Sequence, residues 1–181
     1  MIVAALEKFA SLLYKEYSDN NNKTIYLGQH CEIKTGKLDA NASVIDGAFP
    51  FFTCGKETLK INNYAFDSES IIISGNGEIS VKYYKGKFNA YQRTYVLSPN
   101  EYFFLFLEEC KSCVGDLISN SQGSVIKFIT KGMLEKITIS ANKNAKEINN
   151  KLMRVYTQIT LIKKEIEELT LIKRTLLSKY F

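Results

Sequence analysis

The C-terminal end of the chain carries a heptad pattern, in which apolar side chains recur at alternating spacings of four and three residues. Such spacing is typical of the a and d positions of a coiled-coil helix. Only Lys173 places a charge in the series. The apolar positions of this seam, which we expect to pack against another helix, are Ile148, Leu152, Val155, Ile159, Ile162, Ile166, Leu169 and Leu176.

The length of this helix constrains the rest of the fold. From Ile148 to Leu176 it runs roughly 43 Å at 1.5 Å per residue. A domain of this size cannot cover the whole seam, so the helix needs a second helix beside it. That helix is either the N-terminal one of the same chain or the same helix of a second chain. A helix lying wholly on its own domain is the alternative.

Charge separates this helix from the rest of the 181-residue chain, whose net charge is +5. Residues 1–142 carry 15 basic and 15 acidic residues, which cancel. Residues 143–181 carry nine basic and four acidic residues, and therefore the whole excess. Such asymmetry indicates an acidic partner such as nucleic acid, although a solvated helix face accounts for it equally well.

The remaining sequence alternates between helical and strand patterns. Residues 3–17 have the spacing of a short amphipathic helix, and the polar stretch 18–23 is the best candidate for a linker. We expect a second helix over 101–117, with Glu108 off its apolar face. Short β-branched and aromatic runs predict strands at 25–27, 49–53, 70–74, 79–84, 94–97, 125–129 and 136–139.

The predicted fold class is therefore α+β, with an irregular β-rich domain followed by a long C-terminal coiled-coil helix. With 45% hydrophobic and 24% charged residues, the composition is that of a globular protein. We place the N-terminal amphipathic helix at residues 1–17, the β-rich domain at 24–142 and the long helix at 143–181.

Residue patterns for catalysis are weak. His30 is the single histidine and has no metal-binding motif around it. Cys110 and Cys113 form a C-x-x-C pair, but structural zinc needs a second pair at similar spacing, which the chain lacks. Gly75 and Gly77 lead into a strand and not into a helix, which argues against a phosphate loop. We therefore expect no enzyme, no cofactor and no metal site, and Cys110 in the core.

The cysteines and the N-terminus indicate the compartment. Four unevenly spaced cysteines in a chain large enough to form a core favour reduced thiols. The first ten residues lack a basic start and carry Glu7, and the longest nearly apolar stretch, 102–107, is far shorter than the roughly 20 residues that span a bilayer. We expect a cytoplasmic protein without a membrane segment.

Cations, amides and aromatic side chains gather near the predicted turns. Lys and Arg suit phosphates, while Gln and Arg can pair with base edges in the major groove. A solvated surface is the competing interpretation, because mixed charge on loops is ordinary. As candidate DNA contacts we select Lys34, Thr35, Lys37, Lys56, Asn76, Lys82, Tyr84, Lys85, Gln92 and Arg93.

Several motifs in order along the chain resemble a known family. They are Leu27-Gly28 with 31–37 (CEIKTGK), 49–54 (FPFFTC), 71–77 (IIISGNG) and 87–97 (KFNAYQRTYVL), and then Gly123, Ser124, Ile129, Thr130, Leu134 and the heptad helix. Together they are similar to a target recognition domain of type I restriction-modification specificity subunits. The stretch 140–146 departs from that family, because it enters the helix without proline.

The resemblance implies a protein that binds double-stranded DNA without performing chemistry. Members of the family hold two DNA adenine methyltransferase subunits, and translocase-nuclease (restriction) subunits join in restriction complexes. A full-length member has two recognition domains, and this chain resembles half of one. It is therefore expected to form a homodimer through its heptad helix and to read two identical half-sites related by two-fold symmetry.

Two other functions remain open. A coiled-coil adaptor or decoy fragment would bind methyltransferase subunits without sequence-selective DNA binding. A zinc or thiol-redox module on Cys110 and Cys113 would need bound metal or a redox-active pair, and it ranks behind both.

Overall fold

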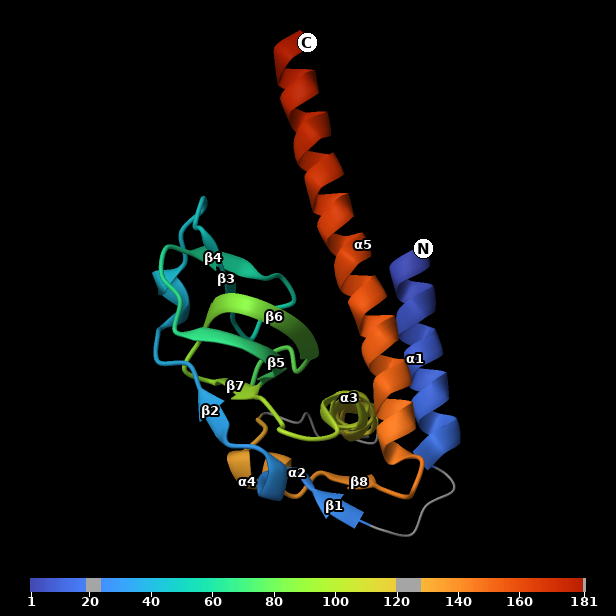
Figure 1. Cartoon of the computed structure of the whole chain (residues 1–181). Helices are drawn as coiled ribbons and strands as arrows, with labels where there is room; N and C mark the ends of the chain where they lie inside the picture. The colour runs from blue at the N-terminus through green and yellow to red at the C-terminus, as the bar shows by residue number, and fades with distance from the viewer. Residues whose placement is uncertain (19–23, 120–127, 181) are drawn as a thin grey trace.

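The computed structural model of the chain describes residues 1–18, 24–119 and 128–180 (Figure 1). Its three long helices are α1 (Ile2–Ser18), α3 (Phe103–Ser119) and α5 (Ala145–Tyr180). They lie on one side of a β-rich body, and α1 runs along the first half of α5 only (Figure 1). The C-terminus of α5 therefore projects away from the rest of the molecule, while the N-terminus of α1 lies beside the middle of α5.

The body is built on a six-stranded sheet in the order β2-β7-β5-β6-β3-β4. Neighbouring strands are antiparallel except β3 and β6, which run parallel. The strands are β2 (Ile33–Thr35), β3 (Phe49–Phe52), β4 (Leu59–Ile61), β5 (Phe66–Ser74), β6 (Val81–Ala90) and β7 (Thr94–Leu97).

The middle of β5 explains why three consecutive isoleucines lie at the centre of this sheet. Side chains alternate between the two faces of a strand. Ile71 and Ile73 therefore pack into the cluster shared with the helices, while Ile72 packs on the other face with Phe52 and Phe88. Because both faces are covered, the strand tolerates an unbroken apolar run.

A second, two-stranded sheet joins the beginning and the end of the body. Here β1 (Thr24–Tyr26) pairs antiparallel with β8 (Thr138–Ser140). The Tyr17 hydroxyl at the end of α1 donates to the Ser140 carbonyl at 2.8 Å, which ties α1 to the segment that leads into α5. Short helical segments complete the body: α2 (Leu27–His30), α4 (Lys131–Glu135) and the 3-10 helix η1 (Ala40–Ala42).

The three long helices share one core with the sheet. Leu152 and Tyr156 of α5 are buried against α1 and α3, and the Tyr156 ring stacks on Phe104 of α3 with centroids 5.4 Å apart. Cys110 is fully buried in this core, as the sequence predicts, and burial raises the pKa of its thiol. All four cysteines are free thiols.

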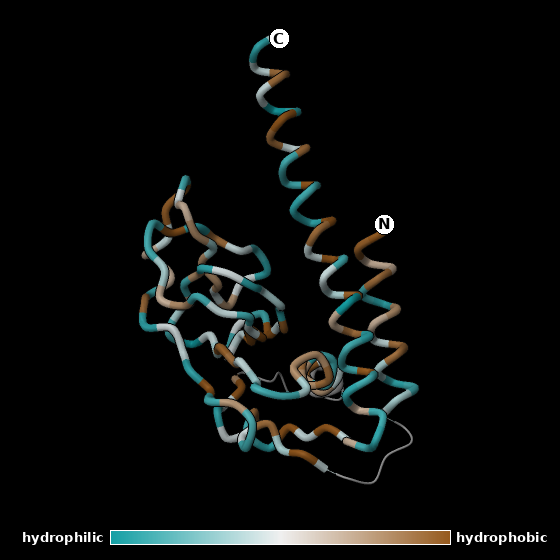
Figure 2. Tube along the Cα trace, in the orientation of Figure 1, coloured by the Kyte–Doolittle hydropathy of each residue, from teal (hydrophilic) through white to brown (hydrophobic). Residues whose placement is uncertain are grey.

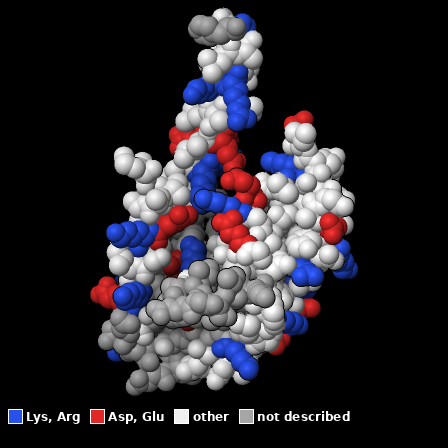
Figure 3. All heavy atoms as spheres, turned by 180° about the vertical axis from the view of Figure 1, so that it is seen from behind, with Lys and Arg blue, Asp and Glu red and all other residues white. Residues whose placement is uncertain are grey.

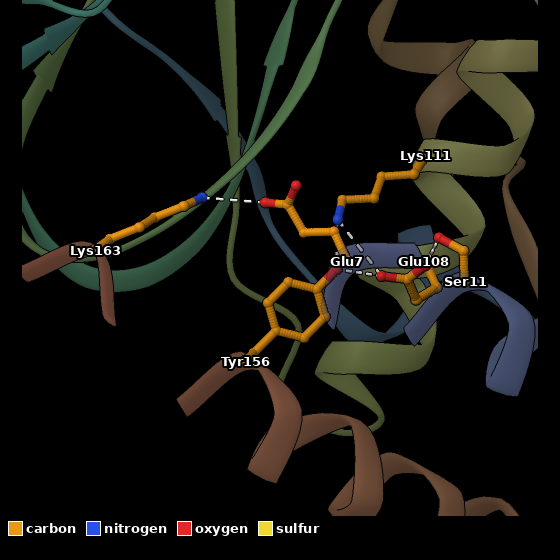
Figure 4. A network of polar contacts seen from close by, with 6 residues as sticks. All are labelled: Glu7, Ser11, Glu108, Lys111, Tyr156 and Lys163. Carbon is orange, nitrogen blue, oxygen red and sulfur yellow. Dashed lines mark hydrogen bonds and ion pairs between the residues drawn. The ribbon is translucent and has the colours of Figure 1, made fainter. Parts of the chain in front are cut away.

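One carboxylate is buried inside the contact of the three helices (Figure 4). The sequence places Glu108 off the apolar face of α3, which is wrong, because the residue is only 2% exposed. Its carboxylate accepts hydrogen bonds from the Tyr156 hydroxyl of α5 and, at 2.8 Å, from the Ser11 hydroxyl of α1. Lys111 of α3 supplies the positive charge, with its Nζ 3.5 Å from Glu108 Oε1. The carboxylate thus connects all three helices.

The heptad seam of α5 divides into two halves. In the first half, Leu152 and Ile159 are buried by the chain's own helices, so the N-terminal helix provides the neighbour that the sequence demands there. In the second half, Ile166 is 52% exposed and Leu169 is 57% exposed. Figure 2 shows hydrophobic positions continuing along α5 beyond the reach of α1. This second half of the seam has no neighbour within the described chain.

Most other predicted elements are confirmed. The helices predicted at 3–17, 101–117 and 143–181 are α1, α3 and α5, and six predicted strands overlap β1, β3, β5, β6, β7 and β8. The sequence missed β2 and β4, which have three residues each. The predicted linker 18–23 and the predicted strand 125–129 lie largely outside the described residues, although Phe128 forms an isolated bridge with Asn76. No helix within the described residues has the length and apolar character needed to cross a membrane.

Candidate nucleic-acid interface

Four loops that are far apart in the sequence meet at one place on the body. The Gln92 backbone N–H donates to the Leu38 carbonyl at 2.9 Å, which joins the loops after β6 and β2. The Arg93 carbonyl accepts from the Gly75 N–H at 2.8 Å and so joins the loop after β5. The Cys54 carbonyl accepts from Glu78 N–H at 3.1 Å and adds the loop after β3. We call residues 36–38, 54–57, 75–78 and 91–93 the loop cluster.

Two glycines permit the loops to approach so closely. A Cβ on Gly36 would lie 1.8 Å from the Ala90 carbonyl oxygen, so any side chain there would force the first and last loops apart. Gly77 has a φ of +65°, a conformation that residues with a Cβ rarely adopt. Glycine at both positions therefore lets the loops pack against one another.

The loop cluster unites five of the ten residues that the sequence selects as DNA contacts. Lys37, Lys56, Gln92 and Arg93 are exposed, and Asn76 is half-buried beside them. Within the described residues, no carboxylate lies within 4.0 Å of the charged group of Lys37, Lys56 or Arg93. Their charges are therefore free to meet phosphates, while the amides and the guanidinium are of the types that pair with base edges.

Lys82 of β6 stabilises one of the loops of the cluster through hydrogen bonds to its backbone. Its Nζ donates to the Gly55 carbonyl at 3.1 Å and to the Lys56 carbonyl at 2.8 Å. Burial lowers the pKa of this ammonium group. Two of its donors thus hold the loop after β3 in position, and Lys82 orients Lys56.

The other four candidates lie elsewhere. Lys34 forms an ion pair with Glu32 at 3.1 Å, and Lys85 forms one with Glu69 at 3.8 Å. Tyr84 packs its ring on Phe52 with centroids 5.3 Å apart, and burial raises the pKa of its hydroxyl. Thr35 lies at the end of β2, opposite Tyr95 of β7 and immediately before the loop cluster. Only Thr35 of these four adjoins the cluster.

A second charged feature is a cleft of about 450 Å³ between the sheet and α5. Of its cations, sequence reasoning selected Lys82 of β6 and missed Lys60, Lys111 and Lys163, because these come from β4, α3 and α5 and share no spacing. Figure 3 shows Lys and Arg side chains near the C-terminal end of α5, with both signs mixed lower down. The charged residues of the cleft are Glu7, Lys60, Lys82, Lys111, Lys163 and Glu167. Two of its four lysines already form ion pairs, Lys163 with Glu7 and Lys111 with Glu108. The cleft is therefore a weaker candidate for binding an acidic ligand than the loop cluster, whose cations have no ion pair within the described residues.

Comparison with known proteins gives the family of this fold. A sequence profile described as "Type I restriction modification DNA specificity domain" matches residues 19–171, which is most of the chain. The chain belongs to this family. The family is that of specificity subunits, which are the non-catalytic components of restriction-modification systems.

Relatives of this specificity domain include the type I restriction enzyme EcoDI specificity subunit of Escherichia coli. The two are 38% identical over 153 residues, which cover 81% of this chain and 34% of the relative. The chain therefore spans about a third of the length of that subunit.

Solved structures of type I specificity subunits share the fold. The S subunit of M. genitalium superposes with a TM-score of 0.69 at 19% identity, over 99% of this chain and 56% of that one. The HsdS subunit of Thermoanaerobacter tengcongensis superposes with a TM-score of 0.54 at 15% identity, over 98% of this chain and 51% of that one. The specificity domain thus corresponds in extent to about half of each solved subunit.

Proposed function

We propose that this specificity domain reads a DNA half-site with its loop cluster. The observation that carries the proposal is the meeting of Lys37, Lys56, Asn76, Gln92 and Arg93 on four loops held together by backbone hydrogen bonds. Cations without an ion pair in the described chain suit phosphates, and flanking amide and guanidinium groups suit base edges in the major groove. Such a combination gives both affinity and sequence selectivity.

The complete DNA-recognition assembly is then a homodimer. The chain spans about half of the solved subunits, and the second half of the α5 seam is exposed although its spacing is that of a coiled coil. Two copies joined through this seam would present two loop clusters related by two-fold symmetry. Such a dimer reads a bipartite target with identical, inverted half-sites.

Chemistry on the DNA belongs to partner subunits in this proposal. The dimer recruits DNA adenine methyltransferase subunits in the cytoplasm, and restriction subunits join the assembly in systems that also cleave DNA. The specificity domain itself contributes recognition and no catalytic group. This division of roles follows from the family, whose specificity subunits are non-catalytic components.

Selection from random duplexes tests the DNA-reading role. The purified chain, with its methyltransferase subunit, is incubated with a pool of random-sequence DNA, and the bound fraction is sequenced. We expect an inverted repeat with a fixed gap to be enriched. The double variant Lys37→Ala with Arg93→Ala should then bind the selected duplex roughly tenfold more weakly or worse, since the loss of a base-reading contact costs about 1–3 kcal/mol and the loss of a phosphate contact weakens binding further.

A charge-matched control separates the loop cluster from general positive charge. Lys8→Ala with Lys15→Ala removes two exposed cations from α1, which lies across the helix layer from the body (Figure 1). This control should keep native affinity. If the chain binds methyltransferase subunits but enriches no sequence, the DNA-reading role is wrong, and the chain is an adaptor that occupies methyltransferase subunits without selecting DNA.

A further inference from the structure

One aromatic side chain is exposed beside the loop cluster. The side chain of Phe128 is 61% exposed, whereas most phenylalanines of the described chain are buried or half-buried. Among the described residues, the only other exposed phenylalanine is Phe9 of α1. Single exposed apolar residues are common on protein surfaces, so the informative property of Phe128 is what lies next to it.

Backbone pairing places Phe128 opposite a candidate DNA contact. Phe128 and Asn76 form an antiparallel bridge, and the Ile129 N–H donates to the Gly75 carbonyl at 2.7 Å. Because this hydrogen bond flanks the bridge, residues 76 and 128 are a non-hydrogen-bonded pair, in which the two Cα atoms lie only about 4.5 Å apart. Side chains of directly opposite residues lie on the same face. The phenyl ring of Phe128 is therefore a neighbour of the Asn76 amide.

The backbone on either side of this ring is fixed to the body. Ile129 is only 4% exposed in the core, and its carbonyl accepts a hydrogen bond from the Tyr95 hydroxyl at 3.0 Å. Thr130 caps α4, since its hydroxyl oxygen accepts from the Met133 N–H at 3.3 Å. Side chains alternate along extended backbone, so the burial of Ile129 turns Phe128 outward. The exposed ring thus has a defined place beside the loop after β5.

A phenyl ring at this place can distinguish bases in one way. It has no hydrogen-bonding group, so it cannot recognise the donors and acceptors of a base edge. In the major groove, thymine presents a C5-methyl group, and apolar side chains such as phenylalanine contact that group. The neighbouring Asn76 carries the amide that pairs with adenine N6 and N7 in the same groove. Asn76 and Phe128 together therefore suit an adenine and a thymine that lie close to each other.

Insertion of the ring between two bases is the alternative. Apolar side chains that act as such wedges enter the minor groove and unstack a base step. The neighbours of Phe128 favour the major groove instead, because the amide and guanidinium groups of Asn76, Gln92 and Arg93 match the donor and acceptor pattern there. The pattern of the minor groove is degenerate and offers these groups little to distinguish.

We infer that Phe128 is a specificity-determining residue that recognises a thymine of the half-site by its C5-methyl group, beside the base that Asn76 contacts. The inference rests on the proposed function, since it requires DNA at the loop cluster. It adds a fifth chain segment to the DNA-binding surface. It also names one base of the target and the chemical group by which that base is distinguished.

Replacement of thymine by uracil tests the inference, because uracil pairs with adenine in the same way and lacks only the C5-methyl group. The duplex is the one selected from the random pool by the chain with its methyltransferase subunit. Each thymine of one half-site is replaced in turn, and dissociation constants are measured by fluorescence anisotropy at fixed salt. At one position we expect binding to weaken roughly fourfold, which corresponds to the contribution of about 0.8 kcal/mol from one methyl group removed from water.

Variants of Phe128 assign that loss to the phenyl ring. With Phe128→Ala, we expect the ratio of the uracil and thymine dissociation constants at this position to fall from about four to about one, because the methyl group no longer meets apolar surface. Phe128→Leu keeps an apolar side chain and should retain a ratio of roughly two or more. Phe9→Ala removes the other exposed phenylalanine and should leave the native ratio unchanged. Circular dichroism confirms that each variant is folded.

The outcomes separate this inference from the proposed function. A selected half-site that contains no thymine, or in which no uracil-to-thymine ratio depends on Phe128, overturns the methyl contact and leaves the loop cluster as the DNA-binding surface. A Phe128→Ala variant that binds all duplexes more weakly but keeps the native ratios assigns the ring to insertion between bases, and this result also overturns the inference. A chain that selects no sequence overturns the proposed function, and the methyl contact with it.

Discussion

The two halves of α5 have the same heptad spacing but different surroundings. The half from Ala145 to Ile159 packs against α1 and α3, whereas apolar residues from Ile166 onward are about half exposed. The difference does not come from the helix itself, because both halves place apolar residues at a and d. It comes from the length of α1, which covers only the first half (Figure 1). A heptad pattern therefore indicates that a face will be covered, and not which molecule covers it.

The largest expected effect concerns how much each half of α5 contributes to the free energy of unfolding. Leu152→Ala removes a fully buried side chain from the common core, and we expect it to lower the free energy of unfolding by about 3 kcal/mol. Leu169→Ala is the matched control and should cost less than about 0.5 kcal/mol. Urea denaturation at low protein concentration, followed by circular dichroism, measures both. Equal losses would mean that the second half is also covered in the monomer.

The next effect concerns dimerisation of the chain through the second half of α5. A charged residue at Ile159 would disrupt the chain's own core, because that side chain is buried. The test therefore uses two exposed seam positions, with the double variant Ile166→Lys and Leu169→Lys. We expect this double variant to weaken dimerisation by roughly 100-fold or more, because a buried unpaired charge costs several kcal/mol. Light-scattering mass over a concentration series measures it, with circular dichroism confirming the fold.

A matched control exists on the same half of the helix. Leu161→Lys with Leu171→Lys replaces two exposed apolar residues outside the a and d positions with the same charges. This control should keep the native mass. If both double variants dissociate alike, general charge repulsion and not the seam accounts for the effect.

The smallest of the three effects concerns the polar contact that fastens the first half. Glu108→Gln removes the negative charge beside Lys111, and we expect a loss of about 2 kcal/mol in the free energy of unfolding, since the half-buried ammonium loses its counter-charge. Glu168→Gln, whose ion pair with Lys164 is exposed, should cost less than about 0.5 kcal/mol. Denaturation curves compare the two. A loss no larger than the control's would show that the Tyr156 hydroxyl and water serve Lys111 as well as the carboxylate does.

Sequence reasoning succeeds where a pattern repeats and fails where a contact is distant. The bounds of β7 and the extent of α5 follow from local alternation and heptad spacing. The burial of Glu108 does not, because its hydrogen-bond partner Tyr156 lies 48 residues further along the chain. The strands β2 and β4 have three residues each with a lysine in the middle, so neither contains the short run of β-branched and aromatic residues that predicts β1 and β8.

The same limit of sequence-based prediction applies to the candidate site. The residue types at Lys37, Gln92 and Arg93 could be selected from the sequence, but so could Lys34 and Lys85, which the structure pairs with carboxylates. What distinguishes the two groups is which loops meet, and that depends on contacts between segments far apart in the chain. Local patterns contain no information on such contacts.

The way in which the four loops are joined has a consequence for how such a domain diversifies. The three hydrogen bonds that connect them run from backbone N–H to backbone carbonyl, so they require no particular side chain at Gln92, Arg93 or Asn76. In the proposed DNA-reading role, substitutions at these positions exchange the chemical groups presented to the ligand while the loops stay in place. New binding preferences are therefore accessible by single amino-acid changes at little cost in folding stability.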